Sequence, residues 1–374
     1  MKVVLAFDSF KGTMDAPTAC RVAAEAVRIV RPSARTVEKP MADGGEGTAE
    51  ILRRALDGER VELDVQGPLP GRRVRAAYTW VAARKLAIVE MAAASGITLV
   101  SREERDPFRA TTFGTGELLR DAETRAGQIW LTVGGSATVD GGIGAAQALG
   151  WRFEDAVGRA VGQGGLALNR IARILSPVGF HPPPVTVLCD VENPLCGPEG
   201  AARVFSPQKG ATPEQVIELE RGLANLAEKV RSDLGMDISG IRGGGAAGGL
   251  AAGAAAFMGA RLKPGIDVLI DAVGLSAELS DADWVIAGEG RLDATSLRGK
   301  VVSGVLREAR CQGARVAVVA GQIALSESEW RAAGIDQVGS LIETAGSAQA
   351  AMERPAHFLA ESVRRLTGAW GPVR

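Results

Sequence analysis

Short apolar segments alternate with amphipathic segments at both ends of this 374-residue chain, and this alternation constrains its fold most strongly. Near the N-terminus, residues 2–7 and 35–40 are typical of buried strands, whereas residues 15–30 and a segment starting near Glu46 are typical of helices. The order strand, helix, strand, helix favours a parallel sheet, because parallel neighbours need a long crossover between them.

The same alternation returns near the C-terminus. Residues 283–287, 314–320 and 337–342 are predicted strands, residues 300–310 are a predicted helix, and residues 347–367 are predicted to form the last helix. We therefore expect both chain ends to build one doubly wound α/β domain, since inserted domains are tolerated where the two connections lie close together.

The middle of the chain has a different pattern. Residues 61–66, 73–81 and 86–91 are predicted strands with no helix between them, which indicates antiparallel pairing. Further strands and helices follow, including a helix of small residues over 246–258, and the pattern predicts a second α/β domain inserted between about 63 and 280. The other predicted elements are helices near 114–124, 141–149 and 213–231, and strands at 129–133 and 185–188.

Composition excludes several classes of protein. With 43 basic and 44 acidic residues the net charge is −1, so the sequence has no electrostatic footprint for nucleic acid or an anionic membrane. The four cysteines form no C-x-x-C pair, which argues against a disulfide framework and a zinc site and favours a cytoplasmic protein. The start of the chain is typical of a strand ending at Asp8 and not of a signal peptide. Only two histidines occur, His181 and His357, and we expect both to be structural.

Glycine is the feature that needs a functional explanation, since 48 residues are glycine, about twice the usual share. Many of these glycines stand beside acids and hydroxyls where predicted strands end, which is where open α/β sheets bind ligands. The first such group is residues 8–12 (Asp-Ser-Phe-Lys-Gly) and the second is residues 42–48 (Ala-Asp-Gly-Gly-Glu-Gly-Thr). Either group could merely cap the helix that follows, although two glycines between two acids favour close approach of a ligand.

The later groups have the same character. Residues 134–142 (Gly-Gly-Ser-Ala-Thr-Val-Asp-Gly-Gly) are typical of an anion-binding loop, and residues 113–117 are a smaller version. Asp190 follows a predicted strand, with a Pro-Gln-Lys-Gly segment at 207–210 downstream. Residues 243–249 contain G-x-G-x-x-G without a preceding strand, so a dinucleotide site is not indicated.

The sixth group, residues 288–293 (Gly-Glu-Gly-Arg-Leu-Asp), follows the predicted strand at 283–287. The nearby Arg298-Gly299-Lys300 is not a phosphate-binding P-loop, because Ala294 and Val301 replace the required residues. Six loops of this composition suit a polyanion together with Mg²⁺. Phosphoryl transfer needs positioning, charge neutralisation and a carboxylate, and it does not need histidine, so the composition favours a kinase.

Seven motifs in chain order give the sequence an overall resemblance to the type I glycerate kinase family. They are residues 8–12, 42–48, 134–138 with 140–142, 189–195, 207–211, 245–250 and 288–293. The resemblance implies ATP-dependent phosphorylation of D-glycerate with Mg²⁺, usually to 2-phosphoglycerate. It also implies a flavodoxin-like domain carrying the insertion. We accordingly expect domains at 1–62 with 281–374 and at 63–280, with the active site in the cleft between them.

The residues of these motifs can be given hypothetical roles. Asp190 is the leading candidate for the catalytic base and Asp43 the second, while Lys11 would neutralise charge. Contacts to substrate or phosphate are expected from Ser9, Gly44, Gly45, Glu46, Gly134, Gly135, Ser136, Thr138, Asp140, Asn193 and Arg291. The nucleotide is expected at Thr115, Gly245, Gly288, Glu289 and Gly290, and the metal at Glu289 and Asp293, although Asp293 could instead cap a helix.

The chain departs from the family pattern at Phe7, Val139, Ser206 and Thr295-Ser296, where the family commonly has Pro, Asn, Gly and Gln-Thr. The departures at Val139 and Thr295 put substrate contacts near these two positions in question. The sequence also leaves alternatives open: formation of 3-phosphoglycerate, a two-domain protein that binds a small acid, and an NAD-dependent dehydrogenase. The oligomeric state stays open, with a homo-oligomer among the options.

Overall fold

The structure is a computed structural model that describes residues 1–42, 44–45 and 47–371. The chain forms two compact units. Unit 1 comprises Met1–Asp43 and Gly265–Arg374, and unit 2 comprises Gly44–Pro264.

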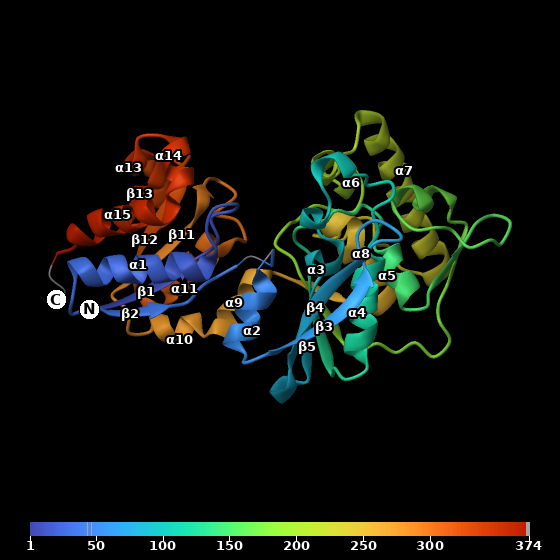
Figure 1. Ribbon diagram of the computed structural model, residues 1–374, viewed down its shortest axis with the longest axis horizontal. Helices are drawn as coiled ribbons and strands as arrows, with labels where there is room; N and C mark the ends of the chain where they lie inside the picture. The colour runs from blue at the N-terminus through green and yellow to red at the C-terminus, as the bar shows by residue number, and fades with distance from the viewer. Residues whose placement is uncertain (43, 46, 372–374) are drawn as a thin grey trace. The chain divides into compact units, whose positions relative to one another are not determined.

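Unit 1 contains a five-stranded sheet in which every pair of neighbours is parallel (Figure 1). Its strand order, β2-β1-β11-β12-β13, is the order of flavodoxin-like sheets. The predicted fold class, a flavodoxin-like domain formed by both chain ends with a second α/β domain inserted, is confirmed. The strands are β1 (Lys2–Phe7), β2 (Arg35–Glu38), β11 (Trp284–Leu292), β12 (Arg315–Ile323) and β13 (Gln337–Ser340).

Helices cover this sheet because its central strands are apolar on both faces, as all six residues of β1 are buried. Helix α1 (Ala16–Val30) begins as predicted, with the Asp15 carboxylate accepting a 2.8 Å hydrogen bond from Thr18 N. It packs against α15 (Pro355–Gly368). The remaining helices of unit 1 are α9 (Gly265–Val273), α10 (Leu275–Leu279), α11 (Val301–Gln312), α12 (Glu327–Ala332), α13 (Leu341–Ala345) and α14 (Ala348–Glu353).

Two elements of unit 1 differ from the prediction: one strand is longer, and one helix is divided in two. Strand β11 continues to Leu292 because Glu289 and Arg291 pair with β12, so part of the sixth glycine group lies within a strand. The predicted last helix is two helices, α14 and α15, with Pro355 at the start of the second. Proline cannot donate the hydrogen bond that would continue the first helix.

Unit 2 contains a mixed six-stranded sheet of order β10-β9-β6-β5-β4-β3. The β3–β4 and β4–β5 pairs are antiparallel, as the sequence predicted, and the other three pairs are parallel. The strands are β3 (Glu59–Gln66), β4 (Arg73–Val81), β5 (Leu86–Glu90), β6 (Gln128–Thr132), β9 (Val185–Leu188) and β10 (Arg261–Lys263), and β7 (Arg152–Glu154) pairs separately with β8 (Arg173–Leu175). The helices are α2 (Thr48–Ala55), α3 (Ala92–Ser95), α4 (Phe113–Glu123), α5 (Ile143–Ala148), α6 (Ala201–Phe205), α7 (Pro213–Leu234) and α8 (Leu250–Met258).

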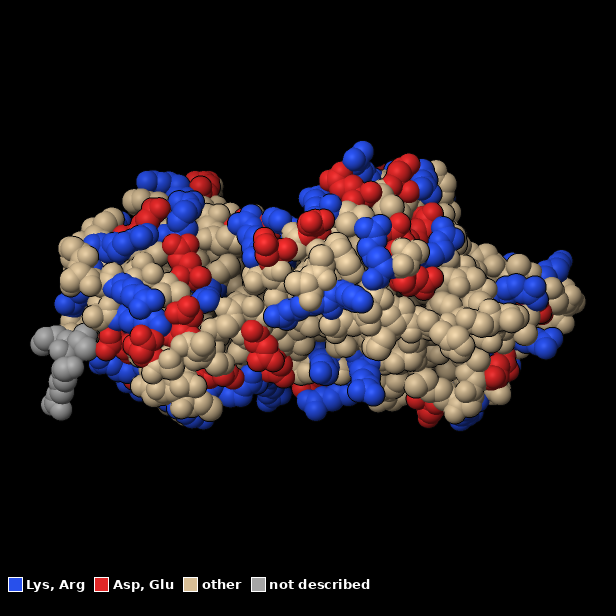
Figure 2. Space-filling view, turned by 90° about the horizontal axis from the view of Figure 1, so that it is seen from below, with Lys and Arg blue, Asp and Glu red and all other residues tan. Residues whose placement is uncertain are grey.

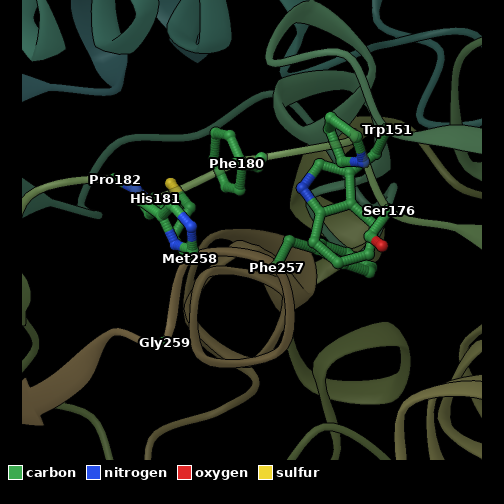
Figure 3. Close-up of a pocket in the computed structure, with 10 residues that line it drawn as sticks. Trp151, Ser176, Phe180, His181, Pro182, Phe257, Met258 and Gly259 are labelled. Atoms are coloured by element: carbon green, nitrogen blue, oxygen red, sulfur yellow. The ribbon is translucent and has the colours of Figure 1, made fainter.

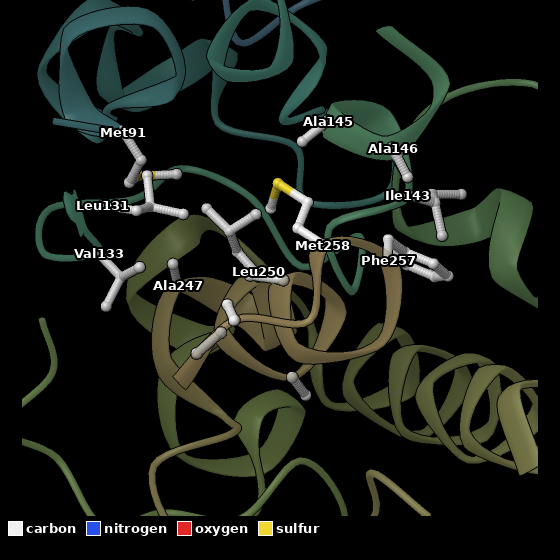
Figure 4. Close-up of a cluster of buried hydrophobic side chains, with 14 of the residues drawn as sticks. Met91, Leu131, Val133, Ile143, Ala145, Ala146, Ala247, Leu250, Phe257 and Met258 are labelled. Atoms are coloured by element: carbon white, nitrogen blue, oxygen red, sulfur yellow. The ribbon is translucent and has the colours of Figure 1, made fainter. Parts of the chain in front are cut away.

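Helix α8 is the small-residue helix that the sequence predicted, although it begins at Leu250 and not at 246. Residues 246–249 form a separate turn because Ala247 and Gly248 have left-handed backbone conformations. The small side chains allow close packing: a Cβ added to Gly253 would lie only 2.2 Å from Gly141 O. Figure 4 shows Leu250 and Met258 of α8 among the buried side chains of the unit 2 core.

The units divide at 43/44 and 264/265, whereas the sequence placed the boundaries at 62/63 and 280/281. Helix α2 packs on β4 and β5 and therefore belongs to unit 2. Helices α9 and α10 pack on α11 and therefore belong to unit 1. The sequence pattern changes some residues away from the point where the chain passes from one unit to the other.

The surface carries both signs of charge. Figure 2 shows Lys and Arg interspersed with Asp and Glu over the visible face, without a large area of one sign. Among the described residues, no helix combines the length and the apolar character that crossing a membrane requires.

Candidate active site

In unit 2, several candidate site residues lie where three parallel strands end. The register of β5, β6 and β9 places Glu90, Thr132 and Leu188 side by side across the sheet. The loops that follow these strands therefore start at one edge, which is the usual ligand-binding edge of an open α/β sheet. Asp190 and the glycine loop 134–142 both lie in these loops.

Gly44, from the second glycine group, meets Asp190 at this edge. Gly44 has a φ of 89°, and a Cβ added there would lie 3.0 Å from Asp190 Oδ2 and 3.1 Å from Leu188 O. The absence of a side chain at Gly44 is thus needed for the loop to approach Asp190. Gly45 accepts a 3.3 Å hydrogen bond from Thr48 N. The predicted residues Asp43 and Glu46 lie outside the described residues.

Glu90 is a residue of this edge that sequence reasoning missed. Its carboxylate accepts hydrogen bonds of 3.4 Å from Gly47 N and from Ala49 N at the start of α2, so it holds the end of the Gly44 loop. Its position at the end of a predicted strand was the available signal. Two buried hydroxyls of the same region, on Thr48 and Thr132, make no hydrogen bond within the described part of the chain. Such hydroxyls suit a region that receives polar ligands or water.

The loop 134–142 is held by backbone hydrogen bonds to the segment 95–97, at the end of α3. Gly135 O accepts from Ile97 N at 2.8 Å, and Ala137 N donates to Ser95 O at 3.0 Å. Gly134 is half-buried and Gly135 is exposed, so the loop opens to solvent at these two residues. Ser136 is only 7% exposed and lies directly after the opening.

Asp140 and Thr138 lie inside the protein. Asp140 is fully buried, and its carboxylate accepts hydrogen bonds from Thr112 N, Thr112 Oγ1, Gly142 N and Gly144 N. Burial raises the pKa of Asp140, against the effect of these donors. Thr138 Oγ1 lies 3.5 Å from Ala247 O. In this structure both side chains shape the loop.

Lys209 is the second residue that sequence reasoning did not single out, although its Pro-Gln-Lys-Gly segment was noted. The side chain is 3% exposed, and Nζ donates to Ser136 Oγ at 2.6 Å and to Thr138 O at 2.8 Å. Burial lowers the pKa of Lys209 to about 7, and the charge of Asp140 acts in the opposite direction. Sequence alone does not distinguish such a buried lysine from an exposed one.

The glycine-rich segment 243–249 contacts both the loop after β9 and the 134–142 loop. Gly245 N donates to Asn193 O at 2.9 Å, and a Cβ added to Gly245 would lie 2.4 Å from Pro194 O. The Asn193 side chain donates to Glu199 O at 2.8 Å. A Cβ added to Gly248 would lie 2.0 Å from Thr138 O, so this glycine lets two loops touch through their backbones. Thr115 is fully buried and bonds to Ser95 Oγ and Met91 O.

Unit 1 has its own group of polar residues, where β1 and β11 end. These neighbouring strands form the point at which the strand order of a flavodoxin-like sheet reverses, and ligands bind at such points. Asp8 N donates to Gly288 O at 2.9 Å, and the Asp8 carboxylate accepts from Ser9 N at 2.6 Å. The Lys11 side chain is exposed, and Gly290 lies near its backbone.

Arg291 and Asp293 continue this group. Arg291 Nε lies 3.6 Å from Asp293 Oδ2, with the arginine side chain 60% exposed. Asp293 accepts hydrogen bonds from Thr295 N at 2.8 Å and from Thr295 Oγ1 at 2.6 Å. These bonds, the hydroxyl first, lower the pKa of Asp293. Asp293 therefore organises its own loop, and its carboxylate is ionised at neutral pH.

Comparison with known proteins decides the family. The sequence matches the Glycerate kinase family over residues 3–371. The chain belongs to this family. It is 42% identical over 368 residues to the glycerate kinase of Halalkalibacterium halodurans, covering 97% of both chains. It is 41% identical over 352 residues to the glycerate 2-kinase of Escherichia coli, covering 93% of this chain and 92% of the relative.

A solved structure agrees with this membership. The crystal structure of a protein assigned as glycerate kinase 2 from Salmonella typhimurium LT2 matches with a TM-score of 0.82 and 39% identity. The match covers 98% of this chain and 97% of that one. This member of the glycerate kinase family is therefore an enzyme, a kinase, as the sequence predicted.

The structure explains two departures of this glycerate kinase family member from the family pattern. Val139 is fully buried in the unit 2 core, so it contributes packing. Thr295 donates to Asp293 and accepts from Lys300 Nζ at 3.0 Å, so it stabilises its loop. Neither departure removes an acid, a glycine or a lysine from the motifs.

A separate hollow of about 580 Å³ lies in unit 2, near the C-terminal end of α8 (Figure 3). Its wall contains Trp151, Phe180, Phe257 and Met258, together with His181, one of the two histidines. None of the lining residues is Asp, Glu, Lys or Arg. This hollow lacks the groups that phosphoryl transfer needs, so it is not the kinase site.

Proposed function

We propose that the protein transfers the terminal phosphoryl group of ATP to the 2-hydroxyl of D-glycerate and so forms 2-phosphoglycerate. Family membership and the names of the relatives support glycerate as the acceptor. The single structural observation that carries the proposal is the approach of Gly44 to Asp190, in a loop that starts next to the 134–142 loop because β9 and β6 end side by side. A carboxylate next to an anion-binding loop is the minimal arrangement for phosphoryl transfer.

Asp190 would act as the general base. It would orient the glycerate hydroxyl and accept its proton while the new oxygen–phosphorus bond forms. Asp43 is the second candidate for the same role. The choice between them can be tested by substituting each residue separately and measuring turnover.

Charge neutralisation would come from backbone amides and cations. Gly134, Gly135 and Ser136 would bind an oxyanion, and the exposed cations Lys11 and Arg291 would neutralise phosphate or the glycerate carboxylate. Gly288 and Gly290 would let the nucleotide approach the backbone of β11. Holding the reactants in one geometry supplies much of the rate enhancement in such reactions.

Mg²⁺ would be held by Glu289 and Asp293 together with phosphate oxygens. The described residues contain no group of three or more His, Cys, Asp or Glu side chains arranged for a metal ion. The donor set nevertheless fits, because Mg²⁺ usually takes one or two protein carboxylates and completes its shell with phosphate and water. The lowered pKa of Asp293 keeps one such carboxylate ionised. When bound, the ion would neutralise phosphate charge.

The product distinguishes the proposal from its alternatives. The purified protein with ATP, MgCl₂ and D-glycerate should give a ³¹P signal of 2-phosphoglycerate, and enolase should consume this product directly. A product that enolase converts only after a mutase is added would be 3-phosphoglycerate. Calorimetry with NAD addresses the dehydrogenase alternative, and glycerate binding without turnover would indicate a small-acid binding protein. We further propose a cytoplasmic location.

A further inference from the structure

Lys209 occupies an unusual position for a lysine. It ends a short 3₁₀ turn, Pro207–Lys209, and its ammonium is enclosed next to the anion-binding loop. The Nζ atom donates to Ser136 Oγ at 2.6 Å and to Thr138 O at 2.8 Å. Burying a lysine is costly unless its donors are satisfied, so two short hydrogen bonds at this place indicate a specific role.

The backbone fixes the lysine in this position. Lys209 N donates to Ser206 O at 3.0 Å, and Ala211 N donates to the same oxygen at 3.1 Å. Gly210 follows with a φ of 95°, and a Cβ added there would lie 2.6 Å from Arg105 O. The turn therefore has little freedom to move the ammonium away from Ser136.

The hydrogen bond to Ser136 determines what the serine can do. A hydroxyl has one proton and two lone pairs. Because the ammonium can only donate, Ser136 Oγ uses a lone pair toward Lys209 and keeps its own proton for another acceptor. The neighbouring Gly134 and Gly135 open to solvent, so an acceptor can arrive from that side.

We propose that Lys209 is a positioning residue that makes Ser136 a hydrogen-bond donor toward a bound oxyanion, either a phosphoryl group or a carboxylate. The inference rests on the proposed function, which places an anion on the 134–138 loop. The new element is that the buried ammonium of Lys209 sets the direction in which the Ser136 hydroxyl donates. Lys209 itself acts through Ser136 and does not touch the anion.

Substitutions test this chain of contacts by calorimetry with two probes, sulfate as a phosphoryl analogue and D-glycerate as a carboxylate. Lys209→Gln and Ser136→Ala should each weaken binding of one probe about 10-fold to 100-fold, the range for a lost charge-assisted hydrogen bond. The probe affected identifies the anion. The double variant should bind no worse than the weaker single variant, because both changes remove the same donor. Lys229→Met, on α7 of the same unit, is the matched control and should bind like the wild type.

A pH series keeps the proposal testable if Lys209→Gln does not fold. When the amine is neutral its lone pair can accept the Ser136 proton, so the serine turns away from the anion. With the pKa of Lys209 lowered to about 7, wild-type affinity for the probe that Ser136→Ala affects should fall between pH 6 and pH 9, where the charges of sulfate and of the glycerate carboxylate are both constant. Ser136→Ala should show a flatter profile. The charged groups on the segments packed against this turn include Asp140, Arg105 and Arg203.

Three results would overturn the inference. One is additive losses in the double variant, since these would mean that Lys209 acts independently of Ser136. The second is unchanged binding of both probes by Ser136→Ala, and the third is pH profiles of the wild type and Ser136→Ala with the same slope. Failure of the proposed function is distinguishable, because a protein that does not phosphorylate glycerate can still give the sulfate result.

Discussion

Gly245, Gly248 and Gly253 of unit 2 are packed more tightly than Gly12 and Gly290 of unit 1, although Gly288 of unit 1 is also packed closely, with an added Cβ 2.2 Å from Val319 O. In unit 2, side chains added to Gly245, Gly248 or Gly253 would come within 2.4 Å of backbone oxygens. In the unit 1 loop after β1, nothing lies within 4 Å of a Cβ added to Gly12, and the nearest atom to one at Gly290 is 3.9 Å away. Glycine in unit 2 is needed for close backbone contact, whereas these two unit 1 glycines leave space open.

The polar side chains of the two units differ in the same way. Asp140, Thr138 and Lys209 of unit 2 are buried and bonded within the protein, while Lys11 and Arg291 of unit 1 are exposed. Buried networks fix a geometry, and exposed cations on long side chains can adjust to a ligand. In the proposed function, unit 2 would therefore align the reactants rigidly, and unit 1 would supply cations that adjust to the ligand.

The largest expected effect is on turnover, through substitution of Asp190 in unit 2. Asp190→Asn should lower kcat by about 10²-fold to 10⁴-fold, because the amide cannot accept the hydroxyl proton. A coupled assay for ADP release measures this loss. Asp64→Asn, an exposed aspartate on β3 of the same unit, is the matched control and should retain full activity. Wild-type turnover by Asp190→Asn would transfer the role of base to Asp43.

The packing contrast predicts different effects of two glycine substitutions. Gly248→Ala should lower the free energy of unfolding by about 2 kcal/mol or more, since the new methyl group meets Thr138 O at a backbone φ of 64°. Gly290→Ala should change it by less than about 0.5 kcal/mol, because the site has space. Urea unfolding of both variants measures the difference. Equal losses would remove the distinction between the two sets of loops.

The exposed cations of unit 1 should contribute less. Lys11→Met should raise a KM by about 10-fold with little change in the melting temperature, because an exposed ammonium makes a modest, salt-screened contribution. Steady-state kinetics at low and at high salt measure this, and the variant should differ less from the wild type at high salt. A KM independent of both the substitution and the salt would show that Lys11 does not contact the substrates.

The smallest effect is expected at Thr295, whose hydroxyl lowers the pKa of Asp293. A carboxyl with a lowered pKa adds stability above its ordinary pKa and loses this contribution as the pH falls through its folded value. Thr295→Val should therefore be less stable than the wild type at pH 7, by less than about 1 kcal/mol, and the deficit should shrink as the pH falls below the ordinary pKa of an aspartate, about 4. Melting curves across this range test the sign, and a deficit that grows on acidification would contradict it.

Much of the fold could be predicted from sequence because apolar periodicity is local. The strand at 2–7, the Asp15 cap of α1 and the antiparallel strands 73–81 appear as expected. The end of β11 could not be predicted, because its last residues are strand only through pairing with β12. The unit boundaries depend on which surface α2, α9 and α10 contact, and a sequence pattern does not contain that information.

The candidate site follows the same rule. Its glycines and acids could be selected because they stand at strand ends, and the approach of Gly44 to Asp190 follows from that placement. The burial of Lys209 and Asp140, and the contact of Glu90 with the start of α2, depend on three-dimensional packing. The sequence therefore does not reveal the residues that contact the candidate site loops from the protein interior.

The most direct test of the central claim is the ³¹P spectrum of the product formed from ATP, MgCl₂ and D-glycerate by the wild-type protein. The account predicts one new phosphomonoester, 2-phosphoglycerate, which disappears when enolase is added. A phosphomonoester that enolase leaves unchanged, or no phosphorylated glycerate at all, would contradict it.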